Sequence, residues 1–574
     1  MPHPNNSLNF AKSHHILLSL QFLGTEKYPN EDDYESFLSK FGGFGNAYTD
    51  MEDTNYYFSV TTQENDPSKT SEALEGGLDR LAQFFISPKF ETSMVERELK
   101  AIDSEYRNGI TSDAWRNYQF LKAVGNQDHP FANFGCGNYE TLKSKGSPID
   151  ELKKFWSSYY TTSNVRLAVA GRSSLDALQK TVEDTFGQLP HSDQPHRRNK
   201  VNPDSPIFPR EHAVYGPENA AFGPEQLGKV REVIPLLESR TLKVMFATPP
   251  LDDPVLRRAT PHRVISHLLG HESPGSLHSM LNDLGYLTSL TSGVGIDTSD
   301  FSLFSISLSL TPKGMKEKDK VLDLVFQWLS LIKKAATEQP ELLVEFHNEL
   351  KQISANAFKF RENGDPTDFC SWAAGKLFDE FKAPKDFLVT DYEYGDYDQA
   401  IVDALLDRLR PGNCMVTVTD SGLTKDNPEE WNVEPLYGAV YRVSDISPEQ
   451  IESWENPKEI DPILHLPALN EYIPTDFSLR CDDEGNTKQL TDAELEESKK
   501  ENPTLLEERT NFRMWHKMDR AWRVPKTFIR LSIVSPVTYQ SPRSMTLSRI
   551  FQRVLNDDLN SFVYDASLSG CHYR

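Results

Sequence analysis

The predicted order of helices and strands repeats along this chain, and such a repeat restricts the chain to folds built from homologous units. Strand-forming residues open the first copy at residues 47–60, where Tyr56, Phe58 and Val60 alternate with polar or smaller residues. Three helical patterns and an apolar strand follow, at residues 70–87, 91–108, 149–160 and 165–170. A second copy opens at residues 301–310, where apolar and serine side chains alternate from Phe304 to Leu310. Its later elements are predicted at residues 319–336, 340–358, 397–410 and 415–419.

The spacing of the copies predicts the domains. The first two copies start roughly 245 residues apart, the length of a large domain, which indicates duplication. A third copy is predicted to begin with a strand at residues 528–534 and a helix at 544–555, and the pattern breaks off within a unit at Arg574. We therefore predict a first domain at residues 1–225, a second homologous domain at 226–455 and a truncated start of a third at 511–574. The polar, turn-rich residues 456–510 are the predicted linker.

The blocks of strands and helices predict the fold class. Adjoining strands in each copy are expected to pair as hairpins, with the long helices packed on one face of the sheet. The chain is therefore predicted to be α+β, with repeated domains that are each a mainly antiparallel sheet covered by helices.

Charge and composition exclude several classes of partner. The chain has 574 residues and a formal net charge of -24, which argues against nucleic acid and anionic membrane surfaces. A soluble acidic surface is the simpler interpretation, and an electrostatic trap for basic peptides is the alternative. No stretch approaches about 18 uninterrupted apolar residues, so we expect no membrane insertion. The five cysteines form no CxxC pair, which predicts reduced thiols and a cytoplasmic location.

Short segments distributed over most of the chain carry a family resemblance. They lie at residues 22–29 (FLGTEKYP), 45–49, 53–58, 77–85, 98–105, 113–116, 129–131, 270–277 and 470–475. In this order the segments resemble those of the insulysin-type zinc metallopeptidases of the pitrilysin, or inverzincin, family. The resemblance implies four homologous α+β domains that form two bowl-shaped halves around a closed chamber. It also implies a zinc-dependent endopeptidase that degrades short peptides in this chamber.

The same resemblance implies an inverted zinc motif, His-x-x-Glu-His, on the helix that leads into residues 22–25. Counting back from this segment places His15, Leu18 and Ser19 at the first histidine, the general-base glutamate and the second histidine. His15 fits a metal ligand, but the leucine side chain accepts no proton and a serine hydroxyl is a poor zinc ligand. We therefore predict no catalytic residue, because Leu18 occupies the general-base position, and less than one zinc ion per chain.

Two acidic residues share one face of a predicted helix, because the seven residues from Glu98 to Glu105 make about two turns. The resemblance implies that Glu105 is the third zinc ligand and Glu98 a supporting carboxylate. Both could instead be solvated acids on an amphipathic helix, and His15, beside His14, could be a surface residue. As a pair, His15 and Glu105 would form at best a weak metal site completed by water.

The positions implied for peptide binding are better preserved. Asn46 and Ala47 match the edge strand on which the family pairs the peptide backbone, a mode that requires only exposed main-chain groups. Gly270, Glu272, Leu290 and Gly293 match a second-domain site for the amino end of the peptide. These residues could equally be ordinary turn glycines and a helix cap. Ser292 stands where the family tends to have glycine, which makes close approach of a peptide there less certain.

Two hypotheses about function remain open. In the first, the chain is a truncated or misassembled product of an insulysin-like endopeptidase and acts on peptide substrates only when complete. In the second, it is a non-catalytic family homologue that binds peptides or partner subunits, with homo-oligomerisation possible. The break inside the third copy favours the first hypothesis, because a dedicated binding protein is expected to keep whole domains.

Overall fold

The computed structural model describes residues 24–62, 66–143, 147–193, 200, 202, 204–205, 207–251, 256, 259–378, 384–483 and 490–573. The larger of two compact units comprises the described residues of Met1–His347 and Asn363–Pro467. The smaller unit comprises those of Asn348–Glu362 and Ala468–Arg574, so the chain passes between the units within one helix, α14 (Pro340–Lys359).

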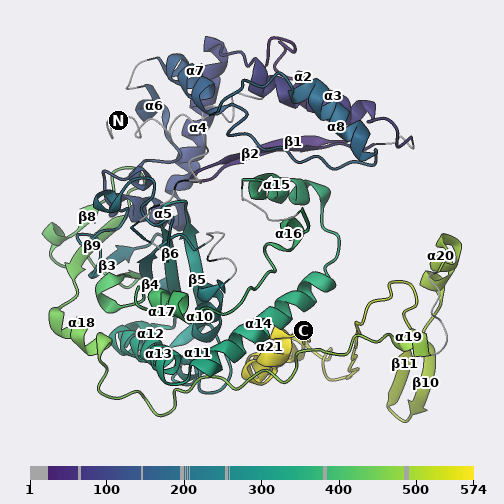
Figure 1. Cartoon of the computed structure of the whole chain (residues 1–574). Helices are drawn as coiled ribbons and strands as arrows, with labels where there is room; N and C mark the ends of the chain where they lie inside the picture. The colour runs from purple at the N-terminus through teal and green to yellow at the C-terminus, as the bar shows by residue number, and fades with distance from the viewer. Residues whose placement is uncertain are drawn as a thin grey trace. The chain divides into compact units, whose positions relative to one another are not determined.

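The first part of the larger unit is a β-hairpin with surrounding helices (Figure 1). β1 (Phe44–Thr49) and β2 (Thr54–Ser59) pair antiparallel, from Phe44 opposite Ser59 to Thr49 opposite Thr54. The helices are α2 (Asp33–Lys40), α3 (Glu72–Ile86), α4 (Thr92–Ile110), α5 (Asp113–Ala123), α6 (Tyr139–Lys143), α7 (Pro148–Tyr159) and α8 (Leu175–Phe186). Capping explains where α8 begins, because the Ser174 hydroxyl accepts a hydrogen bond from the Ala177 amide.

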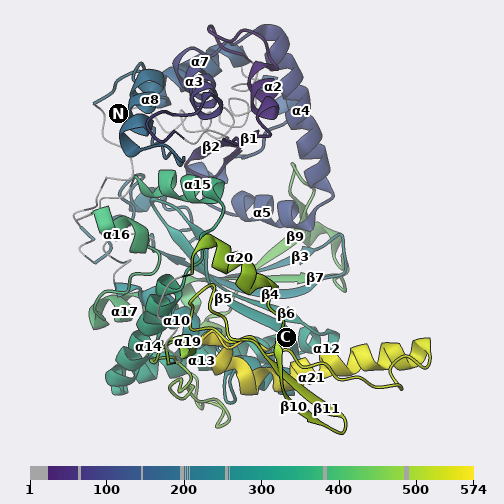
Figure 2. The same ribbon diagram turned by 90° about the vertical axis from the view of Figure 1, so that its right-hand side faces the viewer.

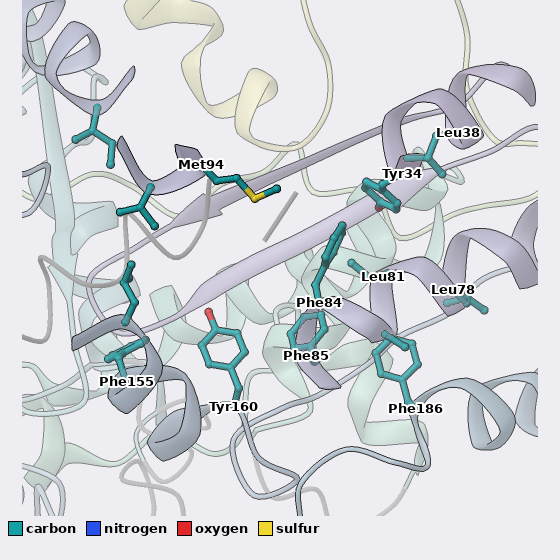
Figure 3. Packing of buried hydrophobic residues seen from close by; sticks show 14 of the residues in the cluster. Tyr34, Leu38, Leu78, Leu81, Phe84, Phe85, Met94, Phe155, Tyr160 and Phe186 are labelled. Atoms are coloured by element: carbon teal, nitrogen blue, oxygen red, sulfur yellow. The ribbon is translucent and has the colours of Figure 1, made fainter. Parts of the chain in front are cut away.

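Aromatic side chains from the helices and the hairpin form the core of this part (Figure 3). Tyr34 meets Phe84 edge to face, with ring centroids 5.1 Å apart. Phe85 packs on Tyr160 at 5.7 Å, and the Tyr160 hydroxyl lies 2.7 Å from that of Tyr56 on β2. These contacts fix α3 and the segment after α7 to one face of the hairpin.

The prediction of a strand at residues 165–170 is wrong, because this segment pairs with no strand among the described residues. Its alternation nevertheless has a structural cause, since Val165, Leu167 and Val169 all pack against the core. Alternating apolar residues indicate which side of an extended segment is buried. A β-strand also needs a second strand at about 4.8 Å with which its backbone forms hydrogen bonds.

A seven-stranded sheet forms the second part of the larger unit, in the order β5-β6-β4-β7-β3-β9-β8. The strands are β3 (Lys229–Ile234), β4 (Arg240–Thr248), β5 (Leu287–Asp297), β6 (Ser302–Leu310), β7 (Cys414–Asp420), β8 (Asn432–Val433) and β9 (Val440–Asp445). Only the pairing of β3 with β7 is parallel. The predicted α+β class, with a mainly antiparallel sheet and helices on its face, is therefore confirmed.

Helices cover one face of this sheet, as Figures 1 and 2 show. They include α10 (Pro261–Leu269), α11 (Leu277–Asp283), α12 (Pro312–Lys316), α13 (Lys318–Glu338) and α17 (Gln399–Leu406). The buried side chains of β6, Phe304, Ile306 and Leu308, point to this layer, while the serines between them point to the other face. The Trp328 indole on α13 donates to the Leu268 carbonyl at 3.1 Å and so ties α13 to α10.

The opposite face of the sheet carries more polar side chains and is covered in part by α5. Leu121 of α5 shares a buried cluster with Met245 and Met415, and Phe120 packs with Val233. The remaining helices of the larger unit are α15 (Pro366–Lys376), α16 (Pro384–Val389) and α18 (Pro448–Glu455). α15 lies against β2, where the Asn55 side-chain amide donates to the Ser371 carbonyl at 3.3 Å.

The smaller unit contains α19 (Arg480–Asp483), α20 (Asp492–Lys500), α21 (Pro542–Leu568) and a hairpin of β10 (Thr504–Arg509) and β11 (Phe512–His516). The prediction of a strand at residues 528–534 is wrong: no strand is assigned there, and Phe528, Ile529 and Val534 are more than 90% exposed. The alternation is present in the sequence, but no described segment covers it. No helix of the described chain is long and apolar enough to cross a bilayer.

Limited trypsin digestion is expected to cleave first beside this exposed segment, after Lys526 or Arg530, because an unpaired extended backbone fits a protease active site. A fragment covering about residues 30 to 455 should persist after the residues beyond about 510 are trimmed, and mass spectrometry of the early products measures this. The internal control is Arg107, an exposed residue within α4, where the helix protects the backbone. Early cleavage at Arg107, or resistance up to residue 573, would contradict the expectation.

Candidate functional site

α4 carries both acidic residues that the sequence singles out. Its apolar positions repeat at helical spacing, and Val95, Leu99 and Ile102 are at most 3% exposed. Glu98 is half-buried, and Glu105 is exposed two turns later. The Glu105 carboxylate lies near the Cys136 thiol, whose pKa is raised to about 11 by burial and, secondarily, by this negative charge. Glu105 therefore faces a neutral thiol.

The described residues contain no group of three or more His, Cys, Asp or Glu side chains that could hold a metal ion. His15, Leu18 and Ser19 lie outside the described residues. Structural zinc sites in proteins need four ligands, and catalytic ones need three protein ligands plus water. Glu105 by itself does not meet this requirement, so the described part of the chain does not fit a zinc site.

β1 presents one edge that no described strand occupies, since it pairs only with β2. The Asn46 side chain is exposed, and its Oδ1 accepts a hydrogen bond from the Ala47 amide at 2.8 Å. This local bond occupies the main-chain donor of Ala47. Asn46 and Ala47 are neighbours on an edge strand, and an added strand would have to displace the Asn46 side chain to reach this amide.

Gly270 and Gly293, which are 23 positions apart, meet at Ser266 on α10. A Cβ at Gly270 would lie 3.2 Å from the Ser266 carbonyl oxygen, and one at Gly293 would lie 3.5 Å from the Ser266 Oγ. Gly293 also has φ +145°, a conformation that side-chain-bearing residues rarely adopt. The Ser292 hydroxyl donates to the Ser266 carbonyl at 2.9 Å. Ser292 thereby pins β5 to the end of α10 at the position where the family tends to have glycine.

Glu272 and Leu290 have different surroundings. Glu272 is half-buried in the loop after α10, and its Oε2 lies 4.0 Å from the Nε2 of His278. The Leu290 side chain is 6% exposed and faces the core, opposite Leu308. Leu290 can therefore meet a ligand only through its backbone on β5, the edge strand of the large sheet.

A pair of side chains on α5, Asp113 and Arg116, holds the first part of the unit to the second; we call it the α5 clasp. Arg116 is 8% exposed, and its guanidinium donates to the carbonyls of Tyr437 at 2.8 Å and Gly438 at 2.7 Å. Asp113 accepts from the backbone amides of Leu236 and Leu237, at 2.8 and 2.9 Å. The family segment at residues 113–116 pointed to this place, but nothing local in the sequence identifies partners 123 and 321 positions away.

Hydrogen bonds within the turn that contacts Arg116 fix its conformation. Glu434 is 1% exposed, and its carboxylate accepts from the amides of Leu436 and Tyr437 at 3.1 and 2.6 Å. Gly438 has φ +72°, which leaves the neighbouring carbonyls directed at the guanidinium without strain. The Tyr106 hydroxyl of α4 donates to the Leu436 carbonyl in the same turn.

A cavity of about 790 Å³ lies between α5 and the sheet face that α5 covers. This volume is within the range of small-ligand pockets, about 300–1,000 Å³. Trp115, Tyr118, Phe131 and Phe301 give it aromatic walls, and Lys243, Ser307 and Thr417 line it from the central strands. Burial raises the pKa of Tyr118 to about 12, so its phenol is a neutral donor at physiological pH.

Two lysines in this cavity are desolvated. Lys122 is 6% exposed, its Nζ donates to the Phe131 carbonyl at 2.9 Å, and burial lowers its pKa to about 8. Burial also lowers the pKa of Lys243. The sequence analysis missed both residues, because each is an isolated lysine in an apolar stretch and only the fold brings them to one cavity.

Comparison with protein families accounts for most of the chain. The profile described as "Insulinase (Peptidase family M16)" matches residues 13–128, "Peptidase M16 inactive domain" matches 148–340, and "Middle or third domain of peptidase_M16" matches 358–574. The chain belongs to peptidase family M16. This M16 chain therefore contains segments of successive family domains in the family order.

Curated relatives match along nearly all of the M16 chain. Insulin-degrading enzyme from Bos taurus is 33% identical over 572 residues, which are 98% of this chain and 51% of that protein. The A-factor-processing enzyme of Saccharomyces cerevisiae is 30% identical over 96% of this chain and 49% of its own length. The chain thus spans about half the length of these relatives.

Solved structures share the fold. A crystal structure of pitrilysin has a TM-score of 0.73 and 24% identity, and covers 97% of this chain and 54% of pitrilysin. A protease from Helicobacter pylori has a TM-score of 0.51 and 17% identity over 72% of this chain and 89% of its own.

Replacing Arg116 by lysine is expected to lower the free energy of unfolding by about 2–3 kcal/mol, because one ammonium cannot reproduce the two-carbonyl geometry of a buried guanidinium. Arg107→Lys is the matched control: the Arg107 side chain is 75% exposed and pairs with Asp103 on the surface. Its effect should stay within about 0.5 kcal/mol. Urea denaturation measures both, and equal effects would contradict the role assigned to the clasp.

Lys122 is expected to make stability depend on pH. The pKa of Lys122 is about 8 in the fold, whereas the ordinary pKa of a lysine is 10.5. Between these values the unfolded chain binds more protons than the folded one, so stability rises as pH increases through this window. The destabilisation by protonated Lys122, about 3 kcal/mol at most, is fully present below pH 8. Denaturation of the wild type and of Lys122→Met at pH 7.5 and pH 10 tests this; a constant difference between the two proteins would overturn it.

Proposed function

We propose that this M16 chain binds unfolded peptides in extended form along two edge strands, β1 and β5. The supporting observation is that each strand has one edge that is free of any described strand, and that each bears residues singled out for peptide binding. An extended peptide added to such an edge gains main-chain hydrogen bonds regardless of its sequence. The names of relatives such as insulin-degrading enzyme agree with polypeptide ligands.

Gly270 and Gly293 support this role for β5. Both lie against Ser266, so the backbone of β5 passes close to the end of α10, with the Ser292 hydroxyl joining the two. Glycines at such a place let a ligand backbone approach as closely as a neighbouring strand would. Glu272, in the loop after α10, provides a carboxylate suited to the positively charged amino end of a peptide.

We do not propose that the chain with this sequence hydrolyses peptides. Zinc, when bound in the complete family site, activates a water molecule. Leu18 has no group that could take a proton from such a water, and Glu105 is the only proposed ligand among the described residues. We infer that the chain is a zinc endopeptidase family member that is inactive as written, a substrate-binding portion whose peptidase activity requires the His-x-x-Glu-His motif.

A non-catalytic homologue is the second candidate, and Leu18 is the observation that favours it. Such a protein would bind peptides or partner subunits, including copies of itself, with the same edge strands. All five cysteines are free thiols, which supports the cytoplasm as the proposed location. The two candidates differ in whether a repaired motif restores turnover.

The proposal predicts peptide binding that depends on main-chain amides. A fluorescein-labelled, unstructured peptide of about a dozen residues should bind in a fluorescence anisotropy assay. The same peptide with N-methyl groups on alternate amides should bind at least about tenfold more weakly, since it loses several hydrogen bonds of about 1 kcal/mol each. Equal binding of the two peptides would exclude pairing along an edge strand.

The same preparation should give no chelator-sensitive turnover and less than one zinc per chain by elemental analysis. Leu18→Glu combined with Ser19→His rebuilds the motif and should raise the zinc content, with Glu105→Ala in that background as the control. Chelator-sensitive cleavage by the unaltered chain would contradict the proposed inactivity.

A further inference from the structure

A row of polar side chains crosses the centre of the large sheet on the face that α5 covers. The register aligns Ser307 of β6 with Lys243 of β4, Lys243 with Thr417 of β7, and Thr417 with Arg231 of β3. Residues directly opposite on neighbouring strands share one face, with Cβ atoms about 4.5–5.5 Å apart. Lys243 and Thr417 are therefore cross-strand neighbours on one face of the sheet, and both line the 790 Å³ cavity.

The positive charges of this row have no anion in the described chain. No described carboxylate lies within 4.0 Å of the ammonium of Lys243 or Lys122, or of the guanidinium of Arg231. Arg231 is 1% exposed, and only its Nη2 donates, to the Gln226 carbonyl at 2.6 Å, while Nε and Nη1 have no hydrogen-bond partner. Charges held away from water without a counter-ion destabilise the fold. An anion in the cavity would remove this cost for Lys243, which lines it, whereas Arg231 is not among the lining residues.

Three acids also line the cavity, Asp50, Glu52 and Asp300. The Asp50 carboxylate accepts from the Met51 amide at 2.7 Å, and the Glu52 carboxylate accepts from the amide and hydroxyl of Ser299 at 2.8 and 2.6 Å. Asp300 accepts from the Val214 amide at 3.1 Å through Oδ1, while its Oδ2 lies 3.5 Å from the Nε2 of His129 and makes no hydrogen bond to a described residue. The Thr417 Oγ1 is likewise buried without a hydrogen-bond partner in the described chain, at the strand position next to Lys243.

We propose that this cavity is a subsite for a carboxylate of the bound peptide, which accepts hydrogen bonds from Lys243 and Thr417. Trp115, Tyr118 and Phe131 hold an apolar side chain next to that carboxylate. The inference rests on the proposed peptide-binding function and adds a preference for peptides in which a carboxylate neighbours a large apolar residue. The carboxylate comes either from an acidic side chain or from the carboxyl terminus.

Blocked dipeptides test this subsite, because they are too short to add a strand to β1 or β5. The probes are N-acetyl-Phe-Glu-amide, its neutral analogue N-acetyl-Phe-Gln-amide, and N-acetyl-Gln-Phe with a free carboxyl terminus. Isothermal titration with the full chain should show the first probe binding at least tenfold more tightly than the second. Stronger binding of the third probe than of the first assigns the subsite to a peptide terminus. Equal affinity of all three overturns the proposal.

Two substitutions test whether Lys243 and Thr417 cause the preference for the acidic probe. Lys243→Met keeps the length of the side chain and removes the charge, so the tenfold preference for the acidic probe should disappear. Thr417→Val is nearly isosteric and removes a hydroxyl that has no partner in the free protein, so it should leave folding intact and weaken the acidic probe about threefold. If Lys243→Met fails to fold, the Thr417→Val result alone decides. Lys154→Met, an exposed lysine on α7, is the charge-matched control and should change nothing.

The outcomes separate this inference from the proposed function. If the long peptide of the anisotropy assay binds but the acidic dipeptide shows no preference over its neutral analogue, edge-strand binding stands and the subsite is wrong. If the dipeptide preference is present and sensitive to Lys243→Met while N-methylation of the long peptide has no effect, the subsite stands and the edge-strand proposal is wrong.

Discussion

The larger unit depends on one buried guanidinium. The Arg116 guanidinium is buried away from water, and a buried cation is tolerated only where hydrogen bonds replace its hydration. The carbonyls of Tyr437 and Gly438 supply them, because Glu434 and the positive φ of Gly438 shape that turn beforehand. Through this contact α5 is fixed on the large sheet. This contact thereby positions α5, which covers the cavity. It also restricts the position of α4, since α4 and α5 are separated by only two residues.

The sequence predicted the helices well because their information is local. α3, α4, α13 and α14 begin and end within two residues of the helices predicted from periodicity. The two strands that failed, at residues 165–170 and 528–534, carry the same alternation as β6. Alternation is a property of one segment, whereas a strand exists only when a second segment supplies hydrogen bonds.

The residues of the candidate site were likewise predicted from the sequence only in part. The family segments located Asn46, Ala47, Gly270 and Gly293, and the structure adds why two glycines 23 positions apart belong together, through their common contact with Ser266. Lys122, Lys243 and Thr417 could not have been chosen from the sequence. Each is an ordinary residue in an apolar or alternating stretch, and the cavity that they share is formed by segments far apart in the chain.

The bond between Glu52 and Ser299 couples the two edge strands. Glu52 lies in the turn that follows β1, and Ser299 lies in the turn that follows β5, so the far ends of both strands are held at one point. This contact ties the turn after β1 to the turn after β5 within the protein. Under the proposed binding mode, a peptide that engages both strands must span the interval between them, whereas a shorter one reaches one strand at a time. Under that mode, chain length becomes a criterion of selection that does not depend on the peptide's sequence.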